Sequence, residues 1–215
     1  MNQQGTPAWF NQRKGRVTGS RIGAILNMNP WSSPQDVLRD MVRDYHGQAN
    51  EFEGNKATEH GNFFEPMAIE DLKIRIGKDI KHTGFHEFED WLGASPDGLV
   101  DDEWIVEIKC PYGLRNDKTV ENFKLLSQQQ YYYAQVQYEM LCSGRTKAYF
   151  YQWTPSGAEL LEEIPLNHDF IEETLPKLKT FYKLYLSEID NEKHLDWLMY
   201  TLRSYQQEAV DKIID

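Results

Sequence analysis

Six residues near the middle of the chain, Trp104–Lys109, read W-I-V-E-I-K and have the pattern of a strand. Successive side chains of a strand point to opposite faces, so one face of this segment is apolar throughout: Trp104, Val106 and Ile108. The other face carries an acid and a lysine, Glu107 and Lys109, after Ile105.

A second acid precedes this strand in Ser95-Pro96-Asp97-Gly98. If residues 101–103 form a turn and Val100 pairs with Trp104, Asp97 lies opposite Glu107, with Cβ atoms roughly 4.5–5.5 Å apart. Two facing carboxylates repel, and a divalent cation between them relieves the repulsion. Lys109 beside that cation could orient or deprotonate a water, which predicts a metal-dependent phosphodiesterase. Taken alone, each string is also typical of a solvated ion pair or a turn.

The composition limits the classes to which the chain can belong. With 215 residues, 25.3 kDa, 40% hydrophobic and 13% aromatic residues, it suits one globular α/β domain. No apolar run approaches the ~18 residues of a membrane span and no signal peptide opens the chain, which predicts a cytoplasmic protein. Cys110 and Cys142 are too few for a disulfide framework or a four-cysteine metal site, and we expect both to be reduced.

The net charge of −11 argues against a protein that simply wraps nucleic acid, since phosphate contacts need lysine and arginine. The basic residues nevertheless cluster near the N-terminus, with no acid between them: Arg13, Lys14, Arg16 and Arg21. We therefore expect a local positive groove on an acidic body, with some carboxylates neutralised by a bound cation.

Helices are expected from Thr18, over residues 33–45, 58–76 and 126–141, and strands over 82–88, 92–100, 104–110, 147–153 and 159–166. The polar residues 46–56 indicate a loop. In the C-terminal part, apolar residues at heptad spacing, from Ile171 to Tyr185 and from Leu195 to Ala209, predict helices that pack on the domain. An oligomer or partner surface is the alternative for these two stripes.

Two further groups of residues support a site. Glu65 shares a helical face with Ile69 and Leu72, which turns a carboxylate toward the apolar side, where a metal contact, a salt bridge or a helix-start position would satisfy it. Gln128, Tyr132 and Gln135 form another helical face, suited to contacts with a phosphodiester backbone. A hydrogen-bonded surface helix would look similar.

Near the N-terminus, Arg13, the Ser20 hydroxyl and the first amides of the helix that begins at Thr18 could converge on one anion. A capped surface helix with solvated basic neighbours is the alternative reading.

Taken in order, five strings resemble those of lambda-type phage exonucleases, the alkaline exonucleases or YqaJ-like viral recombinases of the PD-(D/E)xK superfamily, over about residues 9–153. These strings are Trp9-x3-Arg13-x2-Arg16-Val17-Thr18-Gly19-Ser20, Gly61-x3-Glu65, Ser95-Pro96-Asp97-Gly98, Glu107-Ile108-Lys109-Cys110-Pro111 and Tyr132-x2-Gln135-Val136-Gln137. The resemblance implies a phage- or prophage-encoded enzyme of the bacterial cytoplasm. Such an enzyme degrades the 5′ strand of linear double-stranded DNA to mononucleotides and leaves a 3′ overhang for a single-strand annealing protein.

The resemblance also implies Mg²⁺ as the cofactor, two ions per active site with Mn²⁺ as a substitute, and a ring-shaped homotrimer around DNA. By position, Asp97 and Glu107 resemble the metal ligands, with the Ile108 carbonyl completing one site. Lys109 resembles the residue that positions the attacking water, and Glu65 the supporting acid. The remaining matches are to positions that hold a 5′ phosphate: Arg13, Ser20, Ser95 and Gln135.

The expected fold class is therefore α/β, a restriction-endonuclease-like core with a mixed central sheet flanked by helices and a helical C-terminal extension. We expect one nuclease domain over residues 1–215, with its core at about 9–166 and the helical part at about 167–215. Two alternatives remain: a related endonuclease or an exonuclease of other polarity, and a non-catalytic module that binds DNA ends.

Overall fold

The computed structural model describes residues 3–47 and 54–189. The second heptad stripe and much of the expected loop at 46–56 lie outside these described residues. The helices are α1 (Pro7–Arg13), α2 (Gly19–Ile25), α3 (Pro34–Tyr45), α4 (Lys56–Ile76), α5 (Gln130–Ser143) and α6 (His168–Ile189), with 3₁₀ turns η1 (Tyr112–Leu114), η2 (Val120–Asn122) and η3 (Leu126–Gln128). The strands are β1 (Val17–Thr18), β2 (His86–Phe88), β3 (Leu92–Ala94), β4 (Gly98–Val100), β5 (Trp104–Lys109), β6 (Lys147–Trp153) and β7 (Glu159–Pro165).

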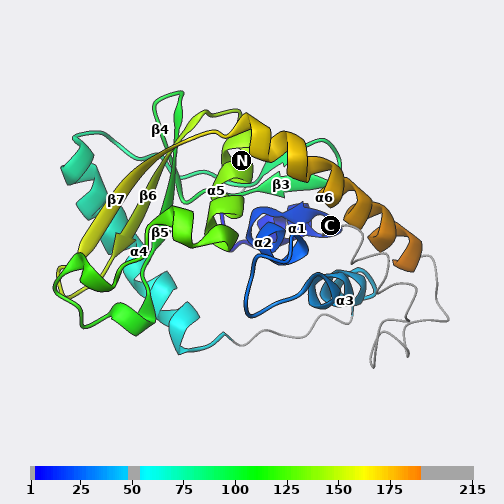
Figure 1. Cartoon of the computed structure of the whole chain (residues 1–215), viewed down its shortest axis with the longest axis horizontal. Helices are drawn as coiled ribbons and strands as arrows, with labels where there is room; N and C mark the ends of the chain where they lie inside the picture. Colours follow the sequence, from blue (N-terminus) through cyan, green and yellow to red (C-terminus); the bar gives the residue numbers. More distant parts are fainter. Residues whose placement is uncertain (1–2, 48–53, 190–215) are drawn as a thin grey trace.

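The strands form two small mixed sheets. In the larger one, the order is β4-β5-β6-β7, with β5 and β6 parallel and both outer pairs antiparallel. In the smaller one, β3 lies between β1, to which it is parallel, and β2, to which it is antiparallel. The expected mixed α/β architecture is confirmed, although the sheet is divided in two (Figure 1).

The division corrects one expectation. Residues 92–100 were expected to form one strand, but the structure ends β3 at Ala94 and begins β4 at Gly98, in the other sheet. Pro96 lies in the gap, and because proline has no N–H it cannot continue a sheet ladder. The strand expected at 82–88 is likewise reduced to His86–Phe88. The break frees residues 95–97 from regular pairing, and Asp97 is one of them.

Helix boundaries mostly follow their capping signals. At the start of α3, the Ser33 hydroxyl accepts the Asp36 N–H and the Asp36 carboxylate accepts the Ser33 N–H, with Pro34 in the first helical position. Helix α4 ends at Gly77, which adopts a left-handed φ of 64°. The helix expected at 126–141 begins later, because Gln129 has a non-helical backbone and separates η3 from α5.

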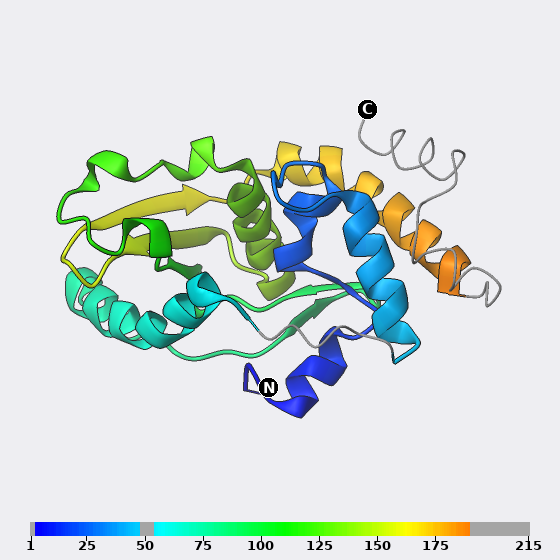
Figure 2. The same cartoon turned by 90° about the horizontal axis from the view of Figure 1, so that it is seen from below.

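The larger sheet buries each face against a different helix. Val106 and Ile108 of β5 pack toward α4, whereas Ile105 packs toward α5, so the expected alternation of β5 is confirmed. A third cluster joins α2, α3, α5 and α6, and it contains Ile171 and Tyr185 of the first heptad stripe. That stripe therefore packs on the rest of the chain. Figures 1 and 2 both show α5 between the larger sheet and α2.

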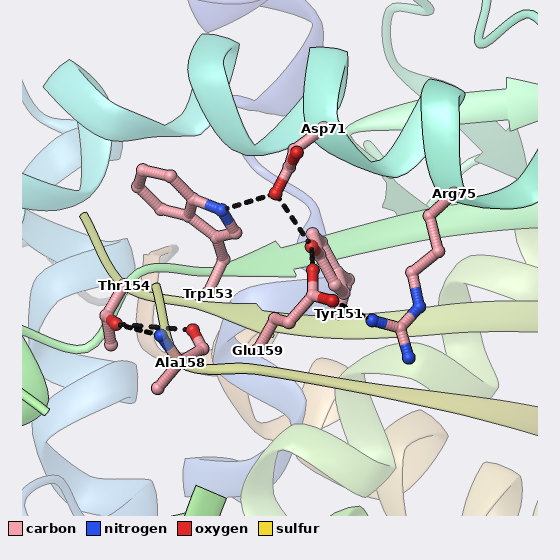
Figure 3. A network of polar contacts seen from close by, with 7 residues as sticks. All are labelled: Asp71, Arg75, Tyr151, Trp153, Thr154, Ala158 and Glu159. Carbon is pink, nitrogen blue, oxygen red and sulfur yellow. Dashed lines mark hydrogen bonds and ion pairs between the residues drawn. The ribbon is translucent and has the colours of Figure 1, made fainter. Parts of the chain in front are cut away.

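A polar network fixes α4 to β6 and β7 (Figure 3). Asp71 of α4 accepts from the Trp153 indole N–H at 2.8 Å and lies 3.3 Å from the Tyr151 hydroxyl. That hydroxyl also contacts Glu159, and Glu159 forms an ion pair with Arg75 one turn further along α4. The network holds α4, and with it Glu65, in register with the sheet.

No helix within residues 3–47 and 54–189 is both long and apolar enough to cross a membrane.

Replacing Asp71 by alanine should lower the free energy of unfolding by about 1 kcal/mol, because the Trp153 N–H loses its acceptor. The matched control is Glu70→Ala on the same helix, which removes an exposed pair with Lys73 and should cost no more than about 0.5 kcal/mol. Urea unfolding of both variants measures the difference. Equal losses would contradict an anchoring role for the network.

Candidate active site

The β4–β5 hairpin positions the first acid. Val100 pairs with Trp104 as expected, and the ladder ends at the Gly98–Val106 pair. Asp97 does not continue that ladder opposite Glu107. Its N–H donates to the Val106 carbonyl at 3.0 Å, and its carboxylate accepts the Ile108 N–H at 2.7 Å. A main-chain donor stabilises a carboxylate, whereas a directly opposed acid repels it, so this arrangement keeps the two acids close at lower cost.

Glu107 is the buried centre of the site, with 2% of its surface exposed. One carboxylate oxygen, Oε1, forms an ion pair with Lys109 and accepts from the Gln135 side-chain amide at 2.7 Å. The other oxygen, Oε2, is buried without a hydrogen-bond partner among the described residues. The Lys109 ammonium lies 4.5 Å from the centre of the Tyr132 ring. Glu107, Lys109, Gln135 and Tyr132, all singled out from the sequence, therefore meet on the α5 side of the sheet.

Burial and neighbouring negative charge raise the pKa values of Asp97 and Glu65. Burial raises the pKa of Asp97 well above its usual range, and the charges of Glu107 and Glu65 raise it further. Burial also raises the pKa of Glu65, with the charge of Glu107 adding to the effect, which places Glu65 within electrostatic reach of the site. Burial opposes the charge on Lys109, but Glu107, Tyr132 and Asp97 together raise its pKa above the ordinary value. Lys109 is therefore a cation at neutral pH.

Sequence reasoning missed a third buried acid, Glu139, of which 1% is exposed. The Gln135 amide that donates to Glu107 also donates to Glu139 Oε1, at 2.8 Å, while Glu139 Oε2 has no partner within the described part of the chain. Burial raises the pKa of Glu139 well above its usual range, and the charges of Glu107 and Asp97 add to the effect. Its spacing from Gln135 could have identified Glu139 in the sequence. Residues four apart share a helical face, and Glu139 follows Gln135 by four residues.

A cationic group lies at the N-terminal side of the site. Arg13 stacks on the Trp9 ring at 4.1 Å and approaches the Ser20 hydroxyl at 3.5 Å, and the Trp9 indole N–H donates to the Ser95 hydroxyl at 2.9 Å. Burial and the charge of Arg21 lower the pKa of Arg13 to about 10, against the opposing charge of Glu139. No carboxylate in the described ranges forms a salt bridge with Arg13, so its charge is available to an external anion.

The expected positive groove is wrong in its extent. Arg16 is bound to the Gln12 carbonyl and to Glu87, at 3.4 Å, and the charges of Asp44 and Asp40 act on Arg21. These acids lie far along the sequence from the basic cluster, which is why the cluster looks unpaired in the sequence. Helix α2 spans only seven residues, so we assign the anion site to Arg13 and not to the N-terminus of this helix.

Gln128 is the other candidate that the structure moves away from its predicted place. It lies in η3, where its side chain accepts the Leu125 N–H at 3.1 Å, and it does not share an α5 face with Tyr132 and Gln135. The structure therefore brings Tyr132 and Gln135 to Glu107, and leaves Gln128 on an exposed turn.

The donor set suits a hard divalent cation. Carboxylate and carbonyl oxygens are the ligands that Mg²⁺ prefers, and Asp97, Glu107 and the Ile108 carbonyl are the candidates that could supply three of them. The partnerless Oε2 of Glu107, buried beside a second acid, is the observation that fits a missing cation. Across residues 3–47 and 54–189, no group of three or more histidine, cysteine, aspartate or glutamate side chains is arranged to hold a metal, so main-chain or solvent oxygens would have to complete the coordination.

Removing the charge of Glu139 should flatten the pH dependence of stability. A buried acid with a raised pKa holds its proton more tightly when folded, so the metal-free protein loses stability as pH rises above the ordinary glutamate value of 4.5. Glu139→Gln keeps an acceptor for Gln135 and removes the group with the raised pKa, so it should lose less stability than the wild type as the pH rises. Urea unfolding in EDTA, at about pH 5 and about pH 8, measures the change. Glu172→Gln on the exposed face of α6 is the control; an equal effect in both variants would refute the prediction.

Comparisons with known proteins identify the family and the fold of the chain. The model of the YqaJ-like viral recombinase domain family matches residues 8–146. The alkaline exonuclease LHK-Exo from Laribacter hongkongensis is 26% identical, with a TM-score of 0.70 over 96% of this chain and 100% of that one, and its complex with dAMP gives a TM-score of 0.71 at the same identity and coverage. A phage-related exonuclease from Haemophilus somnus shares the fold at 19% identity, with a TM-score of 0.62 over 81% of this chain and 96% of that one. No curated protein sequence matches. Because the family model matches more than half of the residues of this chain, the chain belongs to the YqaJ-like viral recombinase domain family.

Proposed function

We propose that this protein is a metal-dependent exonuclease that degrades linear double-stranded DNA in the 5′-to-3′ direction, releases 5′-mononucleotides and leaves a 3′ single strand. Membership of the viral recombinase family and the likeness to alkaline exonucleases support nuclease chemistry. The single observation that carries the proposal is the buried ion pair between Glu107 and Lys109, with the Asp97 carboxylate beside it on the Ile108 N–H. Arg13, which has no acidic partner among the described residues, is the cation available to a phosphate.

Asp97, Glu107 and the Ile108 carbonyl would hold Mg²⁺, or Mn²⁺ in its place. When bound, the cation supplies positive charge to the attacking and leaving oxygens of an in-line displacement, and a second ion at the same acids would share that task. Lys109 stays protonated, because the surrounding charges raise its pKa, and its ammonium is held by Glu107 and by the Tyr132 ring. It therefore acts as a donor that orients the attacking water.

Gln135 and Glu65 act on the acids and not on the water. The Gln135 amide uses both of its hydrogens on Glu107 and Glu139, so it fixes the orientation of the Glu107 carboxylate. For Gln135 to contact a 5′ phosphate, one of these two bonds would have to be exchanged for a phosphate oxygen. Glu65 contributes negative charge that raises cation affinity at the site.

Arg13, Ser20 and Ser95 would hold the 5′ phosphate of the strand being degraded. Arginine and phosphate match in geometry and charge, and the two hydroxyls are further donors within the same group of contacts. A phosphate held there would fix the distance from the strand end to the scissile bond, which makes an exonuclease out of a fold that could otherwise cut internally.

The three central residues should each be essential for turnover. Asp97→Asn, Glu107→Gln and Lys109→Ala should each reduce the degradation of end-labelled linear duplex in Mg²⁺ by at least about 10²-fold while leaving the protein folded. Glu103→Gln on the same hairpin, which removes an exposed acid paired with Lys147, is the control and should keep wild-type activity. The length of the labelled products separates stepwise release from internal cutting, and EDTA should abolish both; a wild-type protein that binds ends without cutting them would refute the enzymatic proposal.

Arg13 should set the preference for the end. The wild type is expected to degrade a 5′-phosphorylated duplex about 10- to 100-fold faster than a 5′-hydroxyl duplex, the factor that one charge-assisted contact provides. Arg13→Ala should erase that ratio, and Lys14→Ala, an exposed basic neighbour, should preserve it. Equal rates on both ends with the wild type would remove the phosphate pocket from the proposal.

The assembly is also part of the proposal. We propose a ring-shaped homotrimer that encloses the duplex and hands its 3′ strand to a single-strand annealing protein, because enclosure retains DNA on a chain of net charge −11 without many phosphate contacts. Light scattering at micromolar concentration should give three times the chain mass of 25.3 kDa. A monomer mass would overturn the ring.

A further inference from the structure

An exposed tryptophan is held at the end of a constrained loop. Trp31 lies between α2 and α3, and 76% of its surface is exposed. The backbone N–H of Trp31 donates to the side-chain oxygen of Asn29 at 2.9 Å, and the backbone N–H of Met28 donates to the Gly23 carbonyl at 2.7 Å. The Ser33 capping box fixes the other end of the loop. The indole is therefore presented to solvent by a segment with few free torsions, so a ligand that contacts it pays little to order the loop.

Close packing of α2 on α5 places this loop beside the active site. A Cβ built on Gly23 would lie 2.7 Å from both Cα and Cβ of Tyr131, which is closer than any real contact. Only glycine permits this approach, and it brings the Trp31 ring to 5.3 Å from the Tyr131 ring in an edge-to-face arrangement.

The aromatic contacts continue from Trp31 to the catalytic centre. The Tyr131 and Tyr132 rings are 4.1 Å apart, and the Tyr132 ring is 4.5 Å from the Lys109 ammonium. Together with the 5.3 Å between Trp31 and Tyr131, these steps span no more than about four base steps of DNA, at about 3.4 Å each. A nucleotide within a few positions of the scissile phosphate is thus within reach of the exposed indole.

Resting on the proposed function, we propose that Trp31 is a stacking platform for a nucleobase of the DNA end, within about four nucleotides of the cleaved bond. The surface pocket beside it, about 630 Å³, is lined by Asn27–Ser33 and Asp36 and contains no lysine or arginine. Such a lining is unsuited to phosphate but offers amide and hydroxyl groups to the edge of a base. Stacking accepts any base and needs no positive charge, which suits an acidic enzyme that must process every sequence.

Photochemical crosslinking locates the contact. Duplexes carry 5-iodouracil at one of the four terminal positions of either strand, and they are irradiated with the wild-type protein in EDTA, where no cleavage occurs. Trp31 is the only aromatic residue between Arg21 and Arg39, and fragmentation of the tryptic peptide of residues 22–39 distinguishes an adduct on Trp31 from one on Met28. We expect this adduct from at least one position and its loss in Trp31→Leu. Its absence at every position would overturn the proposal and assign the exposed indole to another contact, such as a protein partner.

Affinity measurements separate stacking from charge. Trp31→Ala should weaken end binding in EDTA by about 5- to 150-fold, the range that corresponds to one stacked base, and Trp31→Phe should restore part of it. The ratio of wild-type to Trp31→Ala affinity should stay constant as salt is raised, whereas the ratio for Arg13→Ala should shrink. Tyr45→Ala removes another exposed aromatic side chain, half of whose surface is exposed, and should bind like the wild type.

An affinity loss in Trp31→Ala that vanished at high salt, or an equal loss in Tyr45→Ala, would overturn the stacking platform. Degradation in Mg²⁺ is scored in parallel on the same duplexes. If the wild type does not degrade them but the adduct forms, the proposed exonuclease fails and the platform stands. If degradation proceeds and the adduct is absent, the reverse holds.

Discussion

The arrangement of this molecule depends on one buried carboxylate, that of Glu107. It lies at the centre of β5, with an ammonium and an amide on one oxygen and no partner on the other. A buried charge requires compensation, and each compensating group comes from a defined place: Lys109 from the same strand and Gln135 from α5. The oxygen left without a partner is where a cation would complete the balance. A stable fold and a reactive site therefore follow from the same group.

Helix α5 connects the two halves of the site. One side packs on the larger sheet and the opposite side packs on α2, as Figure 2 shows from below. Gln135 and Glu139 lie on the same face of this helix. The Gln135 amide donates to both Glu107 and Glu139, so it ties β5 to the helix that packs on α2. A shift of α5 would move Gln135 and Glu139 relative to α2, and the contact at Gly23 leaves little room for such a shift.

The acids gathered around the candidate site explain part of the negative net charge. Three acids, Asp97, Glu107 and Glu139, are gathered around one site, and burial raises the pKa of two of them, Asp97 and Glu139. The charge available for DNA is reduced to Arg13 and its near neighbours, since Arg16 pairs with Glu87. Under the proposed function, affinity for DNA would come from other sources as well, namely bound cations, enclosure by an assembly and stacking on exposed aromatic rings.

Local patterns in the sequence determined the strand at Trp104–Lys109, its pairing with residues 98–100, and the ends of α3 and α4, because each depends on side chains a few residues apart. The candidate residues Asp97, Glu107 and Lys109 were identifiable for the same reason. Contacts between distant segments decided the rest. Whether Arg16 was free depended on Glu87, which lies 71 residues further along the chain in β2, and Glu139 acquired its importance only when α5 packed against β5. The strand expected at 92–100 was broken because Pro96 could not continue a ladder and its two parts found different partners. Sequence patterns record what a residue prefers among its neighbours, whereas burial, charge pairing and close approach between helices depend on which segments the folded chain brings together.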